Sequence, residues 1–148
     1  MYGTPGDRVE VYGNNVYLPR IPEGFRGERV APTPADKRPF VPSLREVSDA
    51  YENLAARSPE WVVVPYAWAW QWLDNALDER NGRMTTPLQK RRQHLVETQR
   101  FFRELVAGSR GYDVVDAGLG AGFWKDTDMH NSLNRRVYLL RRRSARVE

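Results

Sequence analysis

Residues 112–143, YDVVDAGLGAGFWKDTDMHNSLNRRVYLLRRR, decide the fold that this sequence predicts. The pattern indicates a short apolar strand over residues 114–117 and a last strand over residues 136–140. Between them lie a glycine-rich turn at residues 118–122 and a polar loop. Glycine permits the positive φ angles that other residues avoid, which is typical of a turn at this point.

The last strand carries apolar side chains on both of its faces. Val137 and Leu139 alternate with Tyr138 and Leu140, so each face receives two of them. A strand that is apolar on both sides belongs in the interior of a sheet rather than at its edge. We therefore expect this segment to be a central structural strand.

The composition is that of one domain with a substantial core: 148 residues, of which 41% are apolar. Cysteine is absent, which excludes disulfides, thiolate metal sites and cysteine nucleophiles. The sequence has no apolar run of membrane-spanning length. Its first residues lack the basic and apolar segments of a leader, which predicts synthesis in the cytoplasm without a signal peptide.

The net charge of +4 is concentrated at the end of the chain, because residues 135–148 contain six arginines and one glutamate. Such a segment can bind a polyanion such as nucleic acid, remain solvated, or pair with an acidic neighbouring subunit. Many proteins that bind single-stranded nucleic acid alternate aromatic and basic residues, whereas aromatic residues do not alternate with these arginines. Nucleic acid is therefore the less favoured partner.

Residues 1–42 are rich in glycine and proline and predict an extended N-terminal arm. Within it, residues 8–18 read as a short hairpin that turns at residues 13–15. The following residues have no period of either kind and are either a flexible linker or an arm that lies on a neighbouring copy. Phe25 and Phe40 are the candidate anchors of such an arm.

Two helices and one further strand are expected in the rest of the chain. Ser43 and Glu46 form a capping box that predicts a helix over residues 43–57. A strand is expected over residues 60–66, and a second helix over residues 87–107. The predicted class is α+β: a βαβαββ two-layer sandwich with the helices on one face of a mixed sheet.

An aromatic segment follows the strand at residues 60–66 and contains Trp68, Trp70 and Trp72. We interpret it as strand to about Trp68 and helix over residues 69–79. Clustered aromatics can stack bases or sugars, but tryptophan serves burial more often. The three tryptophans, with the two phenylalanines of the arm, are therefore predicted interface residues.

The second half of the chain combines a helix, a glycine, a strand with a Gly-x-Gly turn, and a final Asn-Arg-Arg-Val strand. The matching positions are Leu88, Arg92 and Val96 in the helix, Gly108 or Gly111 after it, residues 114–120 for the strand and turn, and residues 134–137 for the final motif. In this order it resembles the OmpA-like C-terminal domain, the peptidoglycan-associating module, over residues 43–142. The remaining parts are then the arm at residues 1–42 and a basic tail at residues 143–148.

The resemblance implies peptidoglycan binding. In that family an aspartate and a helix arginine hold the diaminopimelate of a stem peptide, and Arg92 matches the arginine. The family's aspartate position falls in residues 65–68, which contain none, so Asp74 and Asp78 are the nearest candidates. An arginine that pairs bidentately with a carboxylate makes such recognition physically sound.

No catalytic, metal or cofactor site is predicted. His130 lies near Asp126 and Asp128, but spaced acids in a polar loop are usually solvated. The glycines of residues 118–122 lack the Lys-Ser/Thr ending of a phosphate loop. No nucleophile–base arrangement can be assembled from the spacing.

The sequence therefore predicts a non-enzymatic structural protein of a large oligomeric complex, such as a phage tail or baseplate that ends in a virion. The partners would be other protein subunits, with no membrane span. A peptidoglycan-binding envelope module is the first alternative. A nucleic-acid-binding protein that uses the C-terminal arginines is the second.

Overall fold

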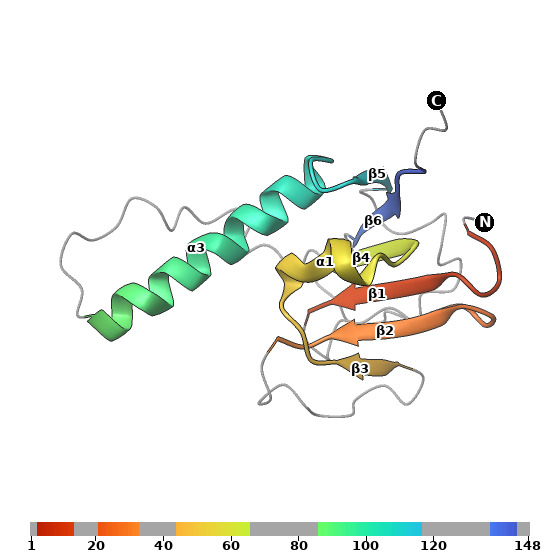
Figure 1. The fold of residues 1–148 in the computed structure, drawn as a ribbon. Coiled ribbons are helices and arrows are strands. Elements are labelled where there is room, and N and C mark those ends of the chain that lie inside the picture. Colours follow the sequence, from red (N-terminus) through yellow and green to blue (C-terminus); the bar gives the residue numbers. More distant parts are fainter. Residues whose placement is uncertain (1–2, 14–20, 33–43, 66–85, 117–136, 145–148) are drawn as a thin grey trace.

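The computed structural model describes residues 3–13, 21–32, 44–65, 86–116 and 137–144. They form a six-stranded mixed sheet with two helices, which is the α+β class that the sequence predicts. Figure 1 shows the sheet with both helices on the same side of it.

The sheet has the strand order β3-β2-β1-β4-β6-β5. The first four strands of the chain run parallel to one another, and β6 is antiparallel to both of its neighbours. The strand bounds are β1 Arg8–Tyr12, β2 Arg26–Val30, β3 Arg45–Val47, β4 Trp61–Pro65, β5 Tyr112–Asp116 and β6 Val137–Arg142.

The prediction of a central last strand is confirmed. β6 lies between β4 and β5, with Leu139 opposite Val63 and Leu140 opposite Val62. Leu139 belongs to the core on one face of the sheet, and Leu140 belongs to the core on the other. The two-sided apolar pattern therefore reports a strand that is buried on both sides.

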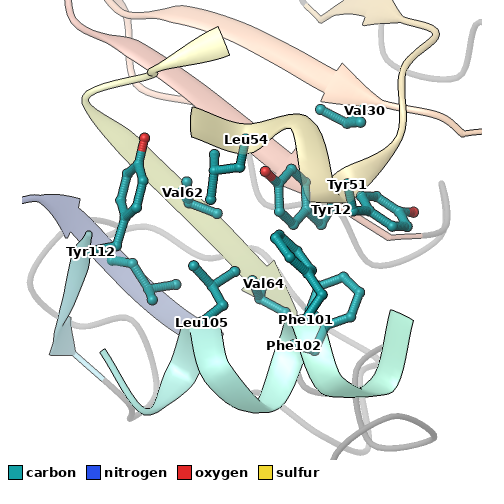
Figure 2. Close-up of a cluster of buried hydrophobic side chains, with 11 residues drawn as sticks. Tyr12, Val30, Tyr51, Leu54, Val62, Val64, Phe101, Phe102, Leu105 and Tyr112 are labelled. Carbon is teal, nitrogen blue, oxygen red and sulfur yellow. The ribbon is translucent and has the colours of Figure 1, made fainter. Parts of the chain in front are cut away.

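The core on the helix side is rich in aromatic rings (Figure 2). Phe101, Phe102 and Leu105 of α3 (Thr86–Val106) point toward the sheet, where they meet Tyr12 of β1 and Val64 of β4. The rings of Phe101 and Phe102 pack edge to face, with 5.2 Å between their centres. Each of these buried side chains contributes about 1.5–3 kcal/mol through the area it removes from water.

The opposite face of the central strands is equally buried. Its core cluster consists of Val9, Val11, Trp61, Val63, Val137 and Leu139, with Ile21 and Phe25 packed against it. Parallel strands buried on both faces read as continuous apolar runs, as in the WVVVP sequence of β4.

The hairpin predicted over residues 8–18 is wrong. β1 is a strand, but its two edges are occupied by β2 and β4, both parallel to it. A strand with both edges occupied has no hydrogen-bonding groups left for a hairpin partner. Because β1 and β2 are interior strands, residues 8–12 and 26–30 belong to the sheet and do not form an arm.

The helix predicted over residues 43–57 is largely replaced by other structure. The segment begins as β3, continues through a 3₁₀ turn at Tyr51–Asn53, and becomes helical only in α1, Leu54–Arg57. Cross-strand pairing of β3 with β2 outweighs the local helix signal. The predicted end is correct, since Ser58 adopts a left-handed conformation with φ 48°.

The second helix and the strand at residues 60–66 are confirmed as α3 and β4. Gly108 ends α3 with φ 80°, and its N–H donates to the Leu105 carbonyl at 3.1 Å. Among the helices that the structure describes, none has the length and apolar character needed to cross a membrane.

Candidate functional site

Two groups of charged side chains are the candidates for a functional site. The first is buried beneath α1 on the helix side of the sheet. Glu10 of β1 is 0% exposed, and its Oε2 accepts a hydrogen bond of 2.8 Å from the hydroxyl of Tyr12. Its Oε1 accepts a bond of 2.9 Å from Nε of Arg57.

Arg57 uses all five of its N–H donors within this group. Nε donates to Glu10, one terminal nitrogen donates to Asp49 and to the Ala50 carbonyl, and the other donates to the Tyr12 hydroxyl and the Tyr51 carbonyl. Burial opposes its charge, but the bonds from these acceptors outweigh burial and raise the pKa of Arg57.

Glu28 of β2 lies directly opposite Glu10. Arg8 joins it to the first group, because Arg8 donates both to the Arg57 carbonyl at 2.8 Å and to Glu28. Arg8 donates to Glu28 at 3.1 Å, and Arg45 donates to it from two nitrogens, at 3.1 and 2.5 Å. Burial by itself would raise the pKa of Glu28, but these hydrogen bonds outweigh it, and the pKa lies below its ordinary value.

Burial and the Glu10 carboxylate both raise the pKa of Tyr12, and Arg57 opposes them only in part. Burial raises the pKa of this hydroxyl well above its usual range, and the adjacent Glu10 raises it further. Both Glu10 oxygens and every Arg57 donor are already bonded inside the protein. This arrangement is a structural network that joins β1, β2 and β3 to the segment leading into α1.

The second candidate lies at the end of β6, where three consecutive arginines leave the sheet. We call Arg141, Arg142 and Arg143 the arginine surface. Arg142 donates to the Ser58 carbonyl at 2.7 Å and pairs with Glu60 at 3.1 Å. The other Glu60 oxygen accepts the backbone N–H of Arg8 at 2.8 Å, so this carboxylate is already engaged on both sides.

Arg143 pairs with Asp113 of β5 at 2.6 Å and donates to the Gly108 carbonyl at 2.6 Å. The hydrogen bond from Arg143 lowers the pKa of Asp113, and the same partner raises the pKa of Arg143. Both side chains are exposed, so solvent screens the pair and its contribution to stability is small.

Arg141 is different. Its guanidinium carbon lies 5.5 Å from the centre of the Trp61 ring, a cation–π arrangement. Trp61 is 1% exposed and fixed in place, because its Nε1 donates to Asp7 at 2.8 Å. Within the described part of the chain, Arg141 has no carboxylate partner, and it is exposed to solvent.

Two open hollows adjoin the arginine surface and share residues 141–144. The larger, of about 900 Å³, is completed by Asp113 and Val115. The smaller, of about 470 Å³, is completed by Thr4, Asp7, Glu60 and Trp61.

Both edges of the described sheet are blunted against pairing with another sheet. β3 is only three residues long and carries Arg45 and Glu46. β5 contains an irregularity between Val114 and Asp116, which leaves Val115 opposite no residue of β6 and 37% exposed. Short, charged or bulged edge strands disfavour edge-to-edge association, so the arginine surface is the stronger candidate for contacts.

Most of the predicted site residues lie outside the described residues: Trp68, Trp70, Trp72, Asp74, Asp78 and Phe40, with Asp126, Asp128 and His130 of the rejected metal cluster. Arg92 lies on α3, but its side chain is not described. Phe25 is partly buried against the core of its own sheet. Among the described residues, no group of three or more His, Asp or Glu side chains is arranged to hold a metal.

The sequence pointed to the basic end of the chain but not to Trp61. Alternation along β6 assigns Arg141 to the face of Leu139. Only the pairing of β4 with β6 places Trp61 opposite Arg141. The missing information is the strand order, which local patterns do not contain.

No family model, curated protein or solved structure matches this chain. The resemblance to the OmpA-like domain therefore stays a prediction that rests on the quoted motifs.

Proposed function

We propose that this chain is a non-enzymatic structural protein of a larger assembly and that it docks an acidic partner subunit on the arginine surface. The observation that carries the proposal is the pair of hollows that share residues 141–144. Arg141 offers a charged, exposed donor group between them, and Val115 adds an exposed apolar contact on the rim. A phage tail or baseplate is the kind of assembly that the sequence favours.

Local charge favours a protein partner over nucleic acid. Arg142 and Arg143 already have carboxylate partners, Glu60 and Asp113. Asp7 also lines the smaller hollow. Binding to a phosphate backbone is driven by several uncompensated cations. A surface that alternates arginines with carboxylates suits the mixed polar rim of a protein interface.

Site-specific photo-crosslinking in cells that naturally produce the protein tests the proposal. A photo-reactive residue at Val115, beside the larger hollow, is expected to give one discrete adduct with another protein. The same residue at exposed Glu97 on α3 is the control and is expected to give none. Adducts to nucleic acid from position 115, or equal labelling from both positions, would contradict the proposal.

A second candidate function is small-ligand binding at the opposite end of the parallel strands. The chain leaves β1 toward β2 on one side and leaves β4 toward α3 and β5 on the other. In open sheets with parallel strands, such a reversal forms a crevice at the carboxyl ends, where ligands commonly bind. Gly13 and Pro65 mark these two ends, and the Gly13 carbonyl accepts a bond from Arg29 at 3.2 Å.

Nuclear magnetic resonance distinguishes this second candidate from the first. Titration with adenosine triphosphate and with nicotinamide adenine dinucleotide is expected to shift the amide signals of Gly13 and Val64. Signals that change only near Arg141 would remove the carboxyl-end candidate and would favour phosphate binding at the arginine surface over the docking of a protein.

The two alternatives from the sequence keep their own tests. Peptidoglycan binding predicts that purified sacculi retain the protein and release it when Arg92 is replaced by alanine. Nucleic-acid binding predicts an affinity that falls steeply with salt and that depends on the arginines at the end of the chain.

A further inference from the structure

We infer that Arg141, which lies over the Trp61 ring, is the anchor that binds a single, isolated carboxylate of a partner protein. The inference deepens the proposed function by naming the group recognised and the side chain that recognises it. It rests on the contrast between Arg141 and its two neighbours along the chain.

The neighbours are held within the protein. Arg142 donates hydrogen bonds to Glu60 and to a backbone carbonyl. Arg143 donates hydrogen bonds to Asp113 and to a second backbone carbonyl. Arg141 lies over the Trp61 ring, and none of the hydrogen bonds and ion pairs found among the described residues uses the N–H donors of its guanidinium. A guanidinium presents these donors as a planar fork that matches a carboxylate.

The platform under Arg141 is rigid. Trp61 begins the central strand β4, is almost fully buried, and is fixed by its hydrogen bond to Asp7. Asp7 also accepts the backbone N–H of Thr4 at 2.9 Å. An arginine that is already ordered on such a platform loses less side-chain freedom on binding than an arginine in free solution.

The surroundings favour one carboxylate over a polyanion. A single anionic group meets Arg141 beside Asp113, which lies opposite it and is already paired with Arg143. A strand of phosphates would also approach Asp7 and Glu60, which line the smaller hollow. Like charges at short range oppose such an approach. The partner is therefore expected to present an isolated acidic residue among neutral or apolar ones.

The test uses the purified full chain and two capped peptides of glycine, serine and leucine, one with a central glutamate and one with glutamine in its place. The glutamate peptide is expected to shift the signals of the Arg141 Nε–H and the Trp61 Nε1–H, and the glutamine peptide is not. A short oligothymidylate is the third probe and is expected to bind more weakly than the glutamate peptide.

Three variants test whether binding of the glutamate peptide depends on Arg141. Arg141→Gln is expected to weaken binding of the glutamate peptide about 10-fold, since a hydrogen-bonded charge is lost. Arg141→Lys is expected to be intermediate, because it keeps the charge without the planar fork. Arg100→Gln removes an exposed arginine from α3 and is expected to leave the affinity within about twofold.

Equal affinity of the wild type and Arg141→Gln overturns the inference, as does failure of the glutamate peptide to bind. Tighter binding of the oligothymidylate overturns it in favour of nucleic acid. If Arg141→Gln leaves peptide binding unchanged while Val115 still crosslinks to a protein, the inference fails and the proposed function survives. If the glutamate peptide binds only when Arg141 is present but Val115 gives no crosslink, Arg141 recognises a carboxylate and the proposed docking of a partner subunit fails.

Discussion

Arg57 is a charged side chain that is buried together with its carboxylate partner, Glu10. Its side chain is 9% exposed and its Glu10 partner 0% exposed, yet every donor and acceptor of the pair is bonded. A buried ion pair adds little stability relative to apolar side chains of the same shape, because desolvation of both charges offsets their attraction. Loss of one member alone leaves a buried charge without a partner.

Replacement of Arg57 by methionine is expected to destabilise the protein by about 3–5 kcal/mol, because Glu10 then stays buried without its cation. The double variant Glu10→Leu/Arg57→Met is expected to be less destabilised than the sum of the two single variants. Urea unfolding of all four proteins measures this coupling. Strict additivity would show that the two side chains do not act as a pair.

Glu28 makes the free energy of unfolding depend on pH in the acidic range. Its folded-state pKa lies below the ordinary 4.5, so the folded protein binds fewer protons than the unfolded chain. The contribution of the carboxylate is therefore complete above about pH 4.5 and is lost as the pH falls through the lower, folded-state pKa.

Glu28→Gln is expected to be less stable than the wild type by about 1.5–3 kcal/mol near neutral pH. The difference is expected to shrink as the pH falls through the lowered folded-state pKa of Glu28, because the wild-type carboxyl group then becomes neutral as well. Urea unfolding of both proteins across this range measures the effect. If the stability difference does not change with pH, the lost stability comes from the changed shape of the side chain and not from its lost charge.

At the scale of elements, α3 is held to the sheet by one apolar stripe. Phe101, Phe102 and Leu105 are all 0% exposed, while Arg100 and Arg103 on the same two turns are exposed. Most helical stability in proteins comes from such packing rather than from helix propensity. The stripe therefore determines where the helix lies.

Leu105→Ala is expected to cost about 2–5 kcal/mol, since it removes buried methyl groups and leaves a cavity beneath α3. Arg100→Ala, on the solvent side of the same helix, is expected to change stability by less than about 0.5 kcal/mol. Thermal and urea unfolding compare the two variants. Equal effects would mean that the helix does not pack on the sheet through this stripe.

At the scale of the whole molecule, β1 is the strand on which the sheet depends. It joins β2 and β3 on one side to β4, β6 and β5 on the other. Val9 and Val11 face one core, and Tyr12 faces the other, all at 0% exposure. The N-terminal residues are therefore part of the folding unit.

A chain that lacks residues 1–13 is expected to lose cooperative unfolding, because the sheet is then divided into two parts with exposed edges and faces. A chain that lacks only residues 145–148 keeps all six strands and is the control. Circular dichroism during thermal unfolding distinguishes them. Cooperative unfolding of the first truncation would restore the interpretation of the N-terminus as a separate arm.

The sequence alone determined the elements whose patterns are long or two-sided. The apolar run of β4, the stripe of α3 and the alternation in β6 predict their structures correctly, since each signal is contained in consecutive residues. The helix expected over residues 43–57 is wrong for most of its length, and only its end is correct. The helix signal of these residues is local, whereas the ion pair between Arg29 and Glu46 and the pairing of Val30 with Val47 join distant segments.

Strand order and partners were decided only by the tertiary structure. The glycine and proline around β1 and β2 suggested an arm, because nothing in their sequence states that each strand has neighbours on both edges. For the same reason the sequence located the arginines, but only the sheet placed Arg141 on Trp61, 80 positions earlier in the chain. Local propensity acts between near neighbours along the chain, whereas a site forms between residues that only folding brings together.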